Sequence, residues 1–328
     1  MKKIINEPNN VVTEMLQGFV KANPQLVYFD GAEVVAKKEK ENKVGLVSGG
    51  GSGHEPAHAG YVGKGMLDAA VAGNVFASPS PDRVLKGIQE ANTGKGVLLI
   101  IKNYSGDIMN FDMAKELAEM EDIRVESVVV KDDVAVEDST HSTGRRGIAG
   151  TVFVHKIAGA KAVEDAELDE VKRVAEKTIA NVRSMGMAMA PCVLPGVGKP
   201  GFALDENEIE IGMGIHGEPG VERTNIKTAE ELANILCGKI LEDFDFANSE
   251  VALMINGLGA TPLMELFILN NEVQKVLSEK NISVYKSFVG NYMTSLEMAG
   301  CSVTLLKLDD ELKKLLDVPC NTPALKVW

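Results

Sequence analysis

The feature that most constrains this chain is a run of glycines directly after a short apolar segment. Residues 44–47 are predicted to form a buried strand, and four of the five residues at 49–53 are glycine. Glycine tolerates positive φ and lets other groups approach the backbone closely, so such a loop offers consecutive uncovered N–H groups. Groups arranged in this way suit an anion or a small oxygen-rich ligand. His54 follows at once, and a polar loop can aim it at that ligand.

Two common nucleotide-binding loops do not fit this sequence. The glycine spacing at 49–53 does not match the Rossmann fingerprint, and residues 54–56, His-Glu-Pro, would interrupt the helix that must follow. A Walker A loop is also absent, because neither 63–65 nor 198–200 has the required upstream glycine and following Ser or Thr. The alternative that the glycines form only a tight connection between elements stays open.

Composition and charge exclude several classes of protein. The 328 residues exceed one typical domain, and 45% hydrophobic with 25% charged residues indicates an ordinary globular protein. A net charge of −13 argues against nucleic acid as a partner, because phosphate binding needs a basic face. We find neither a signal peptide nor an apolar run of the ~18 residues that a membrane span needs. The four cysteines form no CxxC pair and the histidines lack ligand spacing, so we expect a cytoplasmic protein without a metal site.

Predicted strands and helices alternate along the first part of the chain. The clearest strand is 96–102, where five consecutive apolar residues indicate burial on both faces, and 125–130 is another. Such alternation is typical of βαβ units, and ligands collect at the carboxyl ends of their parallel strands. Asp107 follows 96–102 as His54 follows 44–47, so we expect both residues at one edge of the sheet.

The other elements are predicted from periodicity, helix caps and turn residues. We expect helices at 11–19, 66–72, 81–91, 111–120, 144–160, 168–185 and 229–241, a solvated helix surface at 31–40, and strands at 26–29, 208–216, 251–255, 283–289 and 302–306. Four prolines and seven glycines between residues 191 and 220 indicate a junction. We therefore predict an α/β protein of two domains, 1–185 and 186–328, each a largely parallel sheet flanked by helices, with the ligand site between them.

His216 ends a segment in which polar and apolar residues alternate strictly. Period two places His216 on the same face as Glu208 and Glu210, just before a turn at 217–220. His54 and Asp107 near the glycines can act as a general base, and a second histidine can position substrate or act as a nucleophile. A lone His or Asp in a polar loop is more often a turn or capping group. The residues alone predict no more than a small polar ligand between two α/β domains.

Six segments of the chain resemble the signature blocks of dihydroxyacetone kinases. They span essentially the whole chain in the family's order: 5–6, 48–56, 98–107, 144–147, 212–220 and 256–262. The match is to the substrate-binding K domain, and no all-helical nucleotide-binding L domain follows it. The resemblance thus implies the separate K subunit of the type powered by the phosphoenolpyruvate:sugar phosphotransferase relay. In that type, an L subunit carries ADP as a phosphate carrier and an M subunit recharges it.

The same resemblance implies roles for individual residues. His216 would add to the ketone carbonyl of dihydroxyacetone and give a covalent hemiaminal. His54 and Asp107 would hydrogen-bond the substrate hydroxyls and assist deprotonation of the one that is phosphorylated. The remaining substrate contacts would come from Gly51, Ser52, Gly53 and Lys102. The groups left with structural or surface roles are His58, Asp112, His141 and His155.

The family also implies partners and leaves alternatives. We expect a homodimer that contacts the L subunit and, indirectly, the M subunit, with ADP or ATP and Mg²⁺ held on the L subunit and no cofactor on this chain. One alternative is a non-kinase paralogue that binds dihydroxyacetone and co-activates a transcription regulator. Intact His54 and Asp107 favour the enzyme over that paralogue. A stand-alone ATP kinase is disfavoured because the sequence has no phosphate loop.

Overall fold

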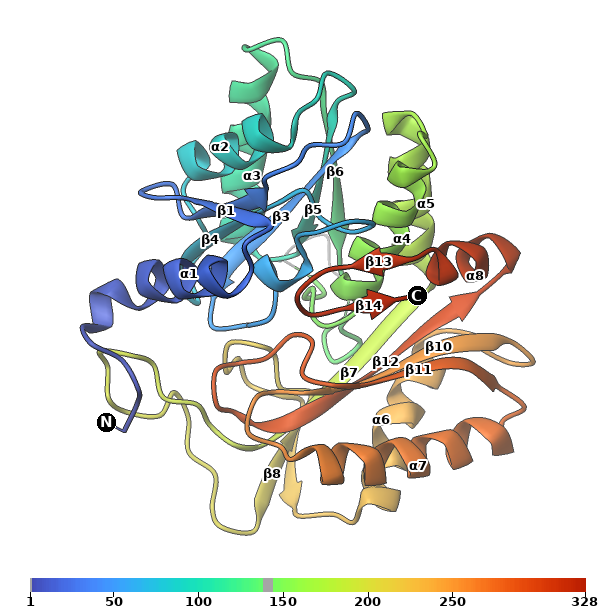
Figure 1. Cartoon of the computed structure of the whole chain (residues 1–328). Helices are drawn as coiled ribbons and strands as arrows, with labels where there is room; N and C mark the ends of the chain where they lie inside the picture. Colours follow the sequence, from blue (N-terminus) through green and yellow to red (C-terminus); the bar gives the residue numbers. More distant parts are fainter. Residues whose placement is uncertain (1, 138–143) are drawn as a thin grey trace.

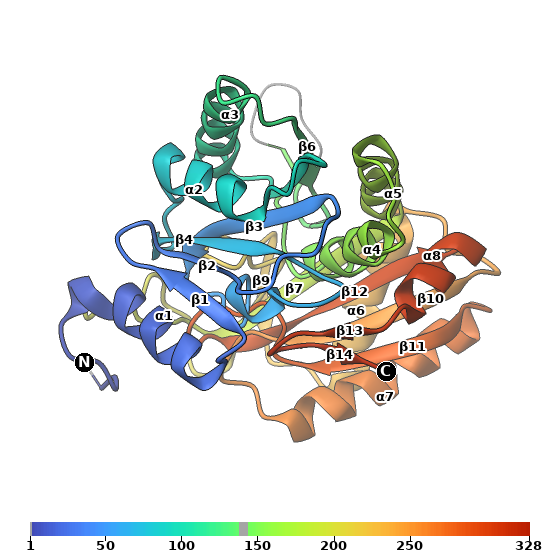
Figure 2. The same cartoon turned by 45° about the horizontal axis from the view of Figure 1, so that its top comes forward.

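The computed structural model describes residues 2–137 and 144–328, which form two six-stranded sheets flanked by helices. Figures 1 and 2 show the two sheets as separate layers, with the first half of the chain in one and the second half in the other. The α/β class is therefore confirmed. Among the residues described, no helix combines the length and the apolar character that crossing a membrane requires.

The first sheet has the strand order β1-β2-β4-β3-β5-β6. Its strands are β1 (Leu26–Phe29), β2 (Val34–Lys37), β3 (Gly45–Ser52), β4 (Ala69–Val75), β5 (Val97–Lys102) and β6 (Val125–Val130). The four strands β4, β3, β5 and β6 are parallel, while β1 and β2 pair antiparallel. Because β3 and β5 are parallel neighbours, their carboxyl ends lie at the same edge, as predicted.

The second sheet has the order β11-β10-β12-β7-β8-β9. Its strands are β7 (Val182–Ala190), β8 (Glu208–Ile211), β9 (Glu222–Asn225), β10 (Glu250–Gly257), β11 (Ser283–Gly290) and β12 (Ala299–Leu308). Only β10 and β11 pair in parallel, so the prediction of a largely parallel second sheet is wrong. Its apolar runs indicate burial on both faces, and covered antiparallel strands satisfy that pattern as well as parallel ones.

Helices cover the sheets in three groups. The first group, α2 (Pro81–Ala91) and α3 (Ser105–Glu119), packs on one face of the first sheet. The second group, α6 (Ala229–Asp243) and α7 (Leu263–Glu279), covers the outer face of the second sheet. Between the sheets lies a shared core with α1 (Val11–Ala22), α4 (Thr151–Val163), α5 (Leu168–Asn181) and α8 (Asp310–Asp317). This core joins the two halves of the molecule.

The end of the chain returns to the first half. Beyond α8, the two-stranded ribbon of β13 (Cys320–Asn321) and β14 (Lys326–Val327) lies beside residues 60–65. Asn321 N donates to Lys64 O at 2.9 Å. Two short 3₁₀ helices, η1 (Pro8–Asn10) and η2 (Ala59–Tyr61), complete the secondary structure of the described residues.

Several local predictions are wrong where small or apolar residues fit more than one element. The stretch 31–40 contains β2, whose Val34, Val35 and Ala36 are buried, and is not a solvated helix surface. The stretch 66–72 is not a helix, because from Ala69 onward it forms β4, which pairs with β2 on one side and β3 on the other. The helix predicted at 168–185 ends at Asn181, so the expected domain limit at residue 185 falls inside β7. The helix expected from 144 begins only at Thr151.

Helix starts that carry a capping residue or a first-turn proline were predicted more accurately. Pro81 occupies the first turn of α2, and a capping box joins Thr228 to Glu231 at the start of α6. The helix expected to resume at 111–120 starts earlier, at Ser105, so Asp107 lies in the first turn of α3 and not in a loop.

Candidate active site

The carboxyl ends of β3 and β5 bring two of the predicted residues, Lys102 and Asp107, together. Lys102 is the last residue of β5, and its Nζ lies 3.3 Å from Oδ2 of Asp107. The ammonium also donates to Gly49 O at 3.3 Å. Both charged side chains are buried, at 1% and 6% exposure. Their pairing lets a charged pair exist in the interior, where either charge alone would be costly.

The glycine run lies within β3 and is not a loop after the strand, because β3 extends to Ser52. The absence of side chains makes room for this ion pair. A Cβ on Gly50, whose φ is +147°, would lie 2.3 Å from Lys102 Nζ. The expectation of uncovered N–H groups is only partly met, because Gly53 N already donates to Glu55 Oε1 at 3.0 Å.

His54 is fully buried, and its hydrogen bonding defines its tautomer. Nδ1 lies 2.8 Å from the carbonyl oxygen of Thr294, which can only accept, so Nδ1 carries the proton. Nε2 is therefore an acceptor, and it has no hydrogen-bond partner within the described residues. Burial, followed by the charges of His216 and Lys102, lowers the pKa of His54 well below its usual range. His54 thus offers a bare basic nitrogen in a dry environment.

His216 reaches the same place from the second half of the chain. The strand predicted at 208–216 ends at Ile211, and Gly212 turns the backbone with a φ of +82°. The His216 ring then lies 4.8 Å from the His54 ring, centroid to centroid. It also packs edge-on against Phe76 at 5.2 Å and Tyr104 at 4.6 Å. The site therefore lies between the two sheets, as the sequence predicts.

Glu218 orients the ring of His216. Its Oε1 lies 2.7 Å from His216 Nδ1, so Nδ1 is the donor, and in the neutral form of the ring Nε2 has a lone pair. Burial acts to raise the pKa of Glu218, but the hydrogen bond and charge of His216 outweigh it and lower the pKa to about 2. The carboxylate is charged at neutral pH and can accept the Nδ1 proton if Nε2 forms a bond.

Sequence reasoning missed four contributors to the site: Glu218, Tyr104, Phe76 and Thr294. Two had a usable signal, because Glu218 follows His216 by two residues and Tyr104 lies between Lys102 and Asp107. Burial, then the charge of Glu218, raises the pKa of Tyr104 well above its usual range. Its buried hydroxyl keeps its proton and has no partner in the described part of the chain. It is a hydrogen-bond donor available to a ligand.

The remaining histidines and cysteines lie elsewhere. His58 and His155 are buried with ring centroids 5.3 Å apart, Asp112 is exposed on α3, and His141 lies outside the described residues. All four cysteines are buried thiols. In 2–137 and 144–328, no group of three or more His, Cys, Asp or Glu side chains is arranged to hold a metal ion.

This fold and site define a family. The Dak1 domain model matches residues 17–324, and the chain belongs to that family. It is 54% identical to the PTS-dependent dihydroxyacetone kinase 1, dihydroxyacetone-binding subunit DhaK, of Listeria innocua, over 99% of this chain and 100% of the relative. It is 55% identical to the corresponding Lactococcus lactis subunit over 94% of each chain. The solved structure of the dihydroxyacetone kinase operon co-activator Dha-DhaQ matches with a TM-score of 0.91 at 39% identity, over 97% of this chain and 98% of that one.

Proposed function

We propose that this chain is the dihydroxyacetone-binding subunit of a PTS-dependent dihydroxyacetone kinase. Similarity to such subunits over nearly their whole length supports the substrate. The observation that carries the proposal is the pair of imidazoles at 4.8 Å between ring centroids, His54 buried and His216 19% exposed, each with a lone pair on Nε2 in its neutral form. A small ketone with flanking hydroxyls offers an electrophilic carbon to one nitrogen and a proton to the other.

His216 is the proposed nucleophile. Its Nε2 forms a bond to the carbonyl carbon of dihydroxyacetone, and the π electrons of the carbonyl move to oxygen. The ring proton on Nδ1 passes to Glu218 and ends on that oxygen, so the product is a neutral hemiaminal. Glycerol has hydroxyls but no carbonyl and cannot form this bond, which would give the site its selectivity.

His54 and Asp107 are the proposed acceptors for the substrate hydroxyls. Nε2 of His54 has the bare lone pair that a general base needs, and such a base typically contributes ~10²–10⁴ in rate. Lys102 pairs with Asp107 at 3.3 Å and holds its carboxylate in place. An L subunit would hold the nucleotide and Mg²⁺; the hydroxyl would take the terminal phosphoryl group of ATP, leaving ADP to be recharged from phosphoenolpyruvate through an M subunit. Positioning and charge stabilisation supply most of such a transfer.

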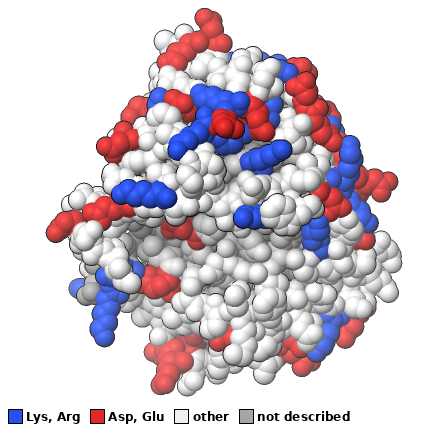
Figure 3. Space-filling view, viewed as in Figure 1, with Lys and Arg blue, Asp and Glu red and all other residues white. Residues whose placement is uncertain are grey.

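We further propose a cytoplasmic homodimer that acts in glycerol metabolism. The surface of the second half offers apolar side chains for pairing. Leu263, Met264 and Phe267 on α7 are 57%, 71% and 56% exposed. Figure 3 shows that one face of this half is largely uncharged, whereas both signs of charge are interspersed over the first half. Sedimentation of the purified chain tests the dimer, and a concentration-independent monomer would contradict it.

The competing function is co-activation of a transcription regulator, which the likeness to the solved co-activator structure favours. A reconstituted relay separates the two. The purified chain, L and M subunits, phosphoenolpyruvate and dihydroxyacetone should give dihydroxyacetone phosphate, and omission of this chain should abolish the product. If dihydroxyacetone binds but the complete mixture gives no product, the kinase proposal fails and the co-activator remains.

The covalent step has its own test. In crystals soaked with dihydroxyacetone, continuous density should join His216 Nε2 to the central carbon of the ligand. His216→Ala should lose that bond and let glycerol compete more nearly equally with dihydroxyacetone. Density joined to His54, or unchanged discrimination by His216→Ala, would contradict the assignment.

A further inference from the structure

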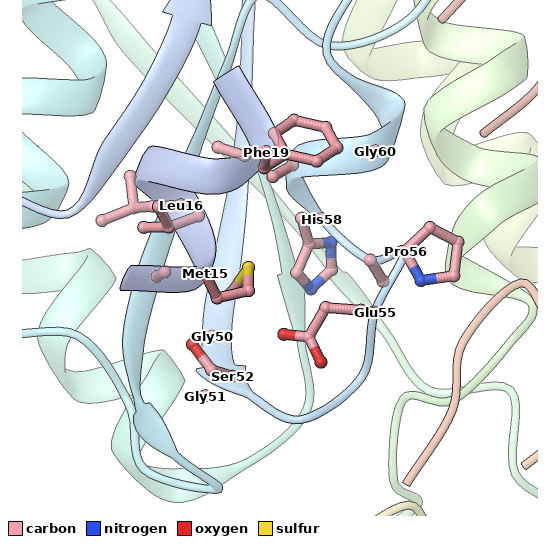
Figure 4. Close-up of a pocket in the computed structure, with 15 residues that line it drawn as sticks. Met15, Leu16, Phe19, Gly50, Gly51, Ser52, Glu55, Pro56, His58 and Gly60 are labelled. Atoms are coloured by element: carbon pink, nitrogen blue, oxygen red, sulfur yellow. The ribbon is translucent and has the colours of Figure 1, made fainter. Parts of the chain in front are cut away.

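A cavity lies beneath α1, behind the glycine run of β3, and it shares only Gly51 and Ser52 with the predicted substrate contacts. Its volume is about 360 Å³. Cavities of ~150 Å³ with apolar walls hold benzene, so this one can hold a small organic molecule. Figure 4 shows its lining residues, which come from α1, β3, β4 and residues 55–60. His54, Asp107 and His216 do not line it.

One polar group that lines the cavity is the ring of His58. Its Nδ1 lies 3.3 Å from Ser48 Oγ, and that hydroxyl already donates its one proton to Ile100 O at 2.6 Å. Nδ1 must therefore be the donor to Ser48, which leaves Nε2 as an acceptor. Nε2 is buried and finds no partner among the residues that the structure describes. In Figure 4 the His58 ring projects into the cavity on the side of the Glu55 carboxylate.

The second polar group is the carboxyl of Glu55. Its Oε1 accepts a hydrogen bond from Gly53 N. Among the described residues, no Lys, Arg or His nitrogen lies within 4.0 Å of the Glu55 carboxylate, so it forms no ion pair. Burial raises the pKa of Glu55, although the Gly53 hydrogen bond opposes this. None of the lining residues is lysine or arginine. One end of the cavity thus holds two acceptors, one of them an acid without a counterion.

We propose that this cavity binds a short primary alkylamine in its ammonium form. An ammonium group has three donors and a positive charge, which match the Glu55 carboxylate and His58 Nε2 together. The apolar walls, with Met15, Leu16 and Phe19, accommodate the hydrocarbon chain. An alcohol brings one donor and no charge, and a carboxylate ligand would meet a like charge. The inference does not depend on the proposed function.

Methyl NMR of methionine tests the site directly, because Met15 lines it. The full chain is labelled at the methionine methyls, and the Met15 signal is assigned with Met15→Leu. The protein is titrated with n-hexylammonium, n-hexanol and n-hexanoate, three ligands with one chain and different head groups. Hexylammonium should shift the Met15 signal saturably and bind at least tenfold tighter than hexanol, and hexanoate should give no saturable shift. The signal of Met113, exposed on α3, reports binding to the acidic surface and should not follow the same curve.

Two variants identify the groups that act. Glu55→Gln keeps an acceptor for Gly53 N but removes the charge, and it should weaken hexylammonium at least tenfold while leaving hexanol unchanged. Met15→Trp fills the cavity and should abolish binding of both, read from the change in melting temperature with ligand concentration. Hexanol binding as tightly as hexylammonium, or no saturable shift with any of the three ligands on the unmodified chain, would overturn the proposal.

Discussion

The rings of His54 and His216 meet edge to face with their centroids 4.8 Å apart, although one residue follows β3 of the first sheet and the other follows β8 of the second. Each ring donates from Nδ1 to a fixed acceptor, a carbonyl for His54 and a carboxylate for His216. In the neutral form of each ring, Nε2 is therefore the nitrogen with the lone pair. The different acceptors give the two histidines different proposed roles, His216 as nucleophile and His54 as base. Only His216 has a carboxylate that can take up the Nδ1 proton when Nε2 forms a bond.

Glu218→Gln tests that separation. The amide can still accept from Nδ1 but cannot take its proton, so we expect kcat/KM in the reconstituted relay to fall by about 10²-fold or more. The rate at which the covalent adduct forms should fall in parallel, measured by time-resolved binding. Glu222→Gln, on the exposed strand β9, is the matched control. Normal adduct formation by Glu218→Gln would show that Glu218 only positions the ring.

Asp107→Asn removes the charge and basic oxygen from the acceptor side of the site. We expect kcat to fall ~10²–10⁴-fold while the covalent adduct with His216 still forms, because the two steps use different groups. Asp112→Asn on the exposed face of the same helix should leave the rate unchanged. The measurement is steady-state turnover beside adduct occupancy in crystals. Near-normal turnover would remove Asp107 from the mechanism.

Gly50→Ala should disrupt the Lys102–Asp107 pair. The new methyl group would lie 2.3 Å from Lys102 Nζ at a φ of +147°, so either the ammonium or the strand must move. We expect a loss of about 1–3 kcal/mol in the free energy of unfolding and a large loss of activity. Gly18→Ala is the control, since Gly18 lies inside α1 with nothing within 4 Å, and it should stabilise by about 0.5–1 kcal/mol. Urea unfolding measures both, and equal effects of the two changes would contradict this account.

His155 makes the stability of the fold depend on pH. Burial, with the charge of Lys102, lowers its pKa from 6.5 to about 3 in the folded state. The unfolded chain therefore binds the proton first as pH falls, and stability is complete above 6.5 and lost progressively below it. At pH 5 the cost is about 2 kcal/mol. His155→Leu removes this cost. In urea unfolding, the free energy of unfolding of the variant minus that of the unmodified chain should therefore rise by about 2 kcal/mol from pH 7 to pH 5. A constant difference between the two pH values would show that His155 is protonated or solvated in the folded state.

The sequence by itself determined the elements that depend on local chemistry. The glycine run, the buried strand 97–102 and the helix starts at Pro81 and Thr228 each carry a signal within a few residues. The same local signals placed His54 and Asp107 after parallel strands, so their location at one sheet edge was predictable. Resemblance to a family then supplied roles that spacing alone did not.

Tertiary structure decided the rest. Whether two strands of the second sheet pair parallel or antiparallel depends on which strands become neighbours. An apolar run predicts a buried strand but carries no information about that direction. Residues 69–72 become part of the first sheet because their partners, β2 and β3, lie on both sides of β4. The tautomer of His54 depends on a carbonyl from a distant segment, that of Thr294, and its ring meets His216 from the other sheet. The reason is physical: hydrogen bonds and desolvation act between neighbours in space, and no local sequence pattern records them.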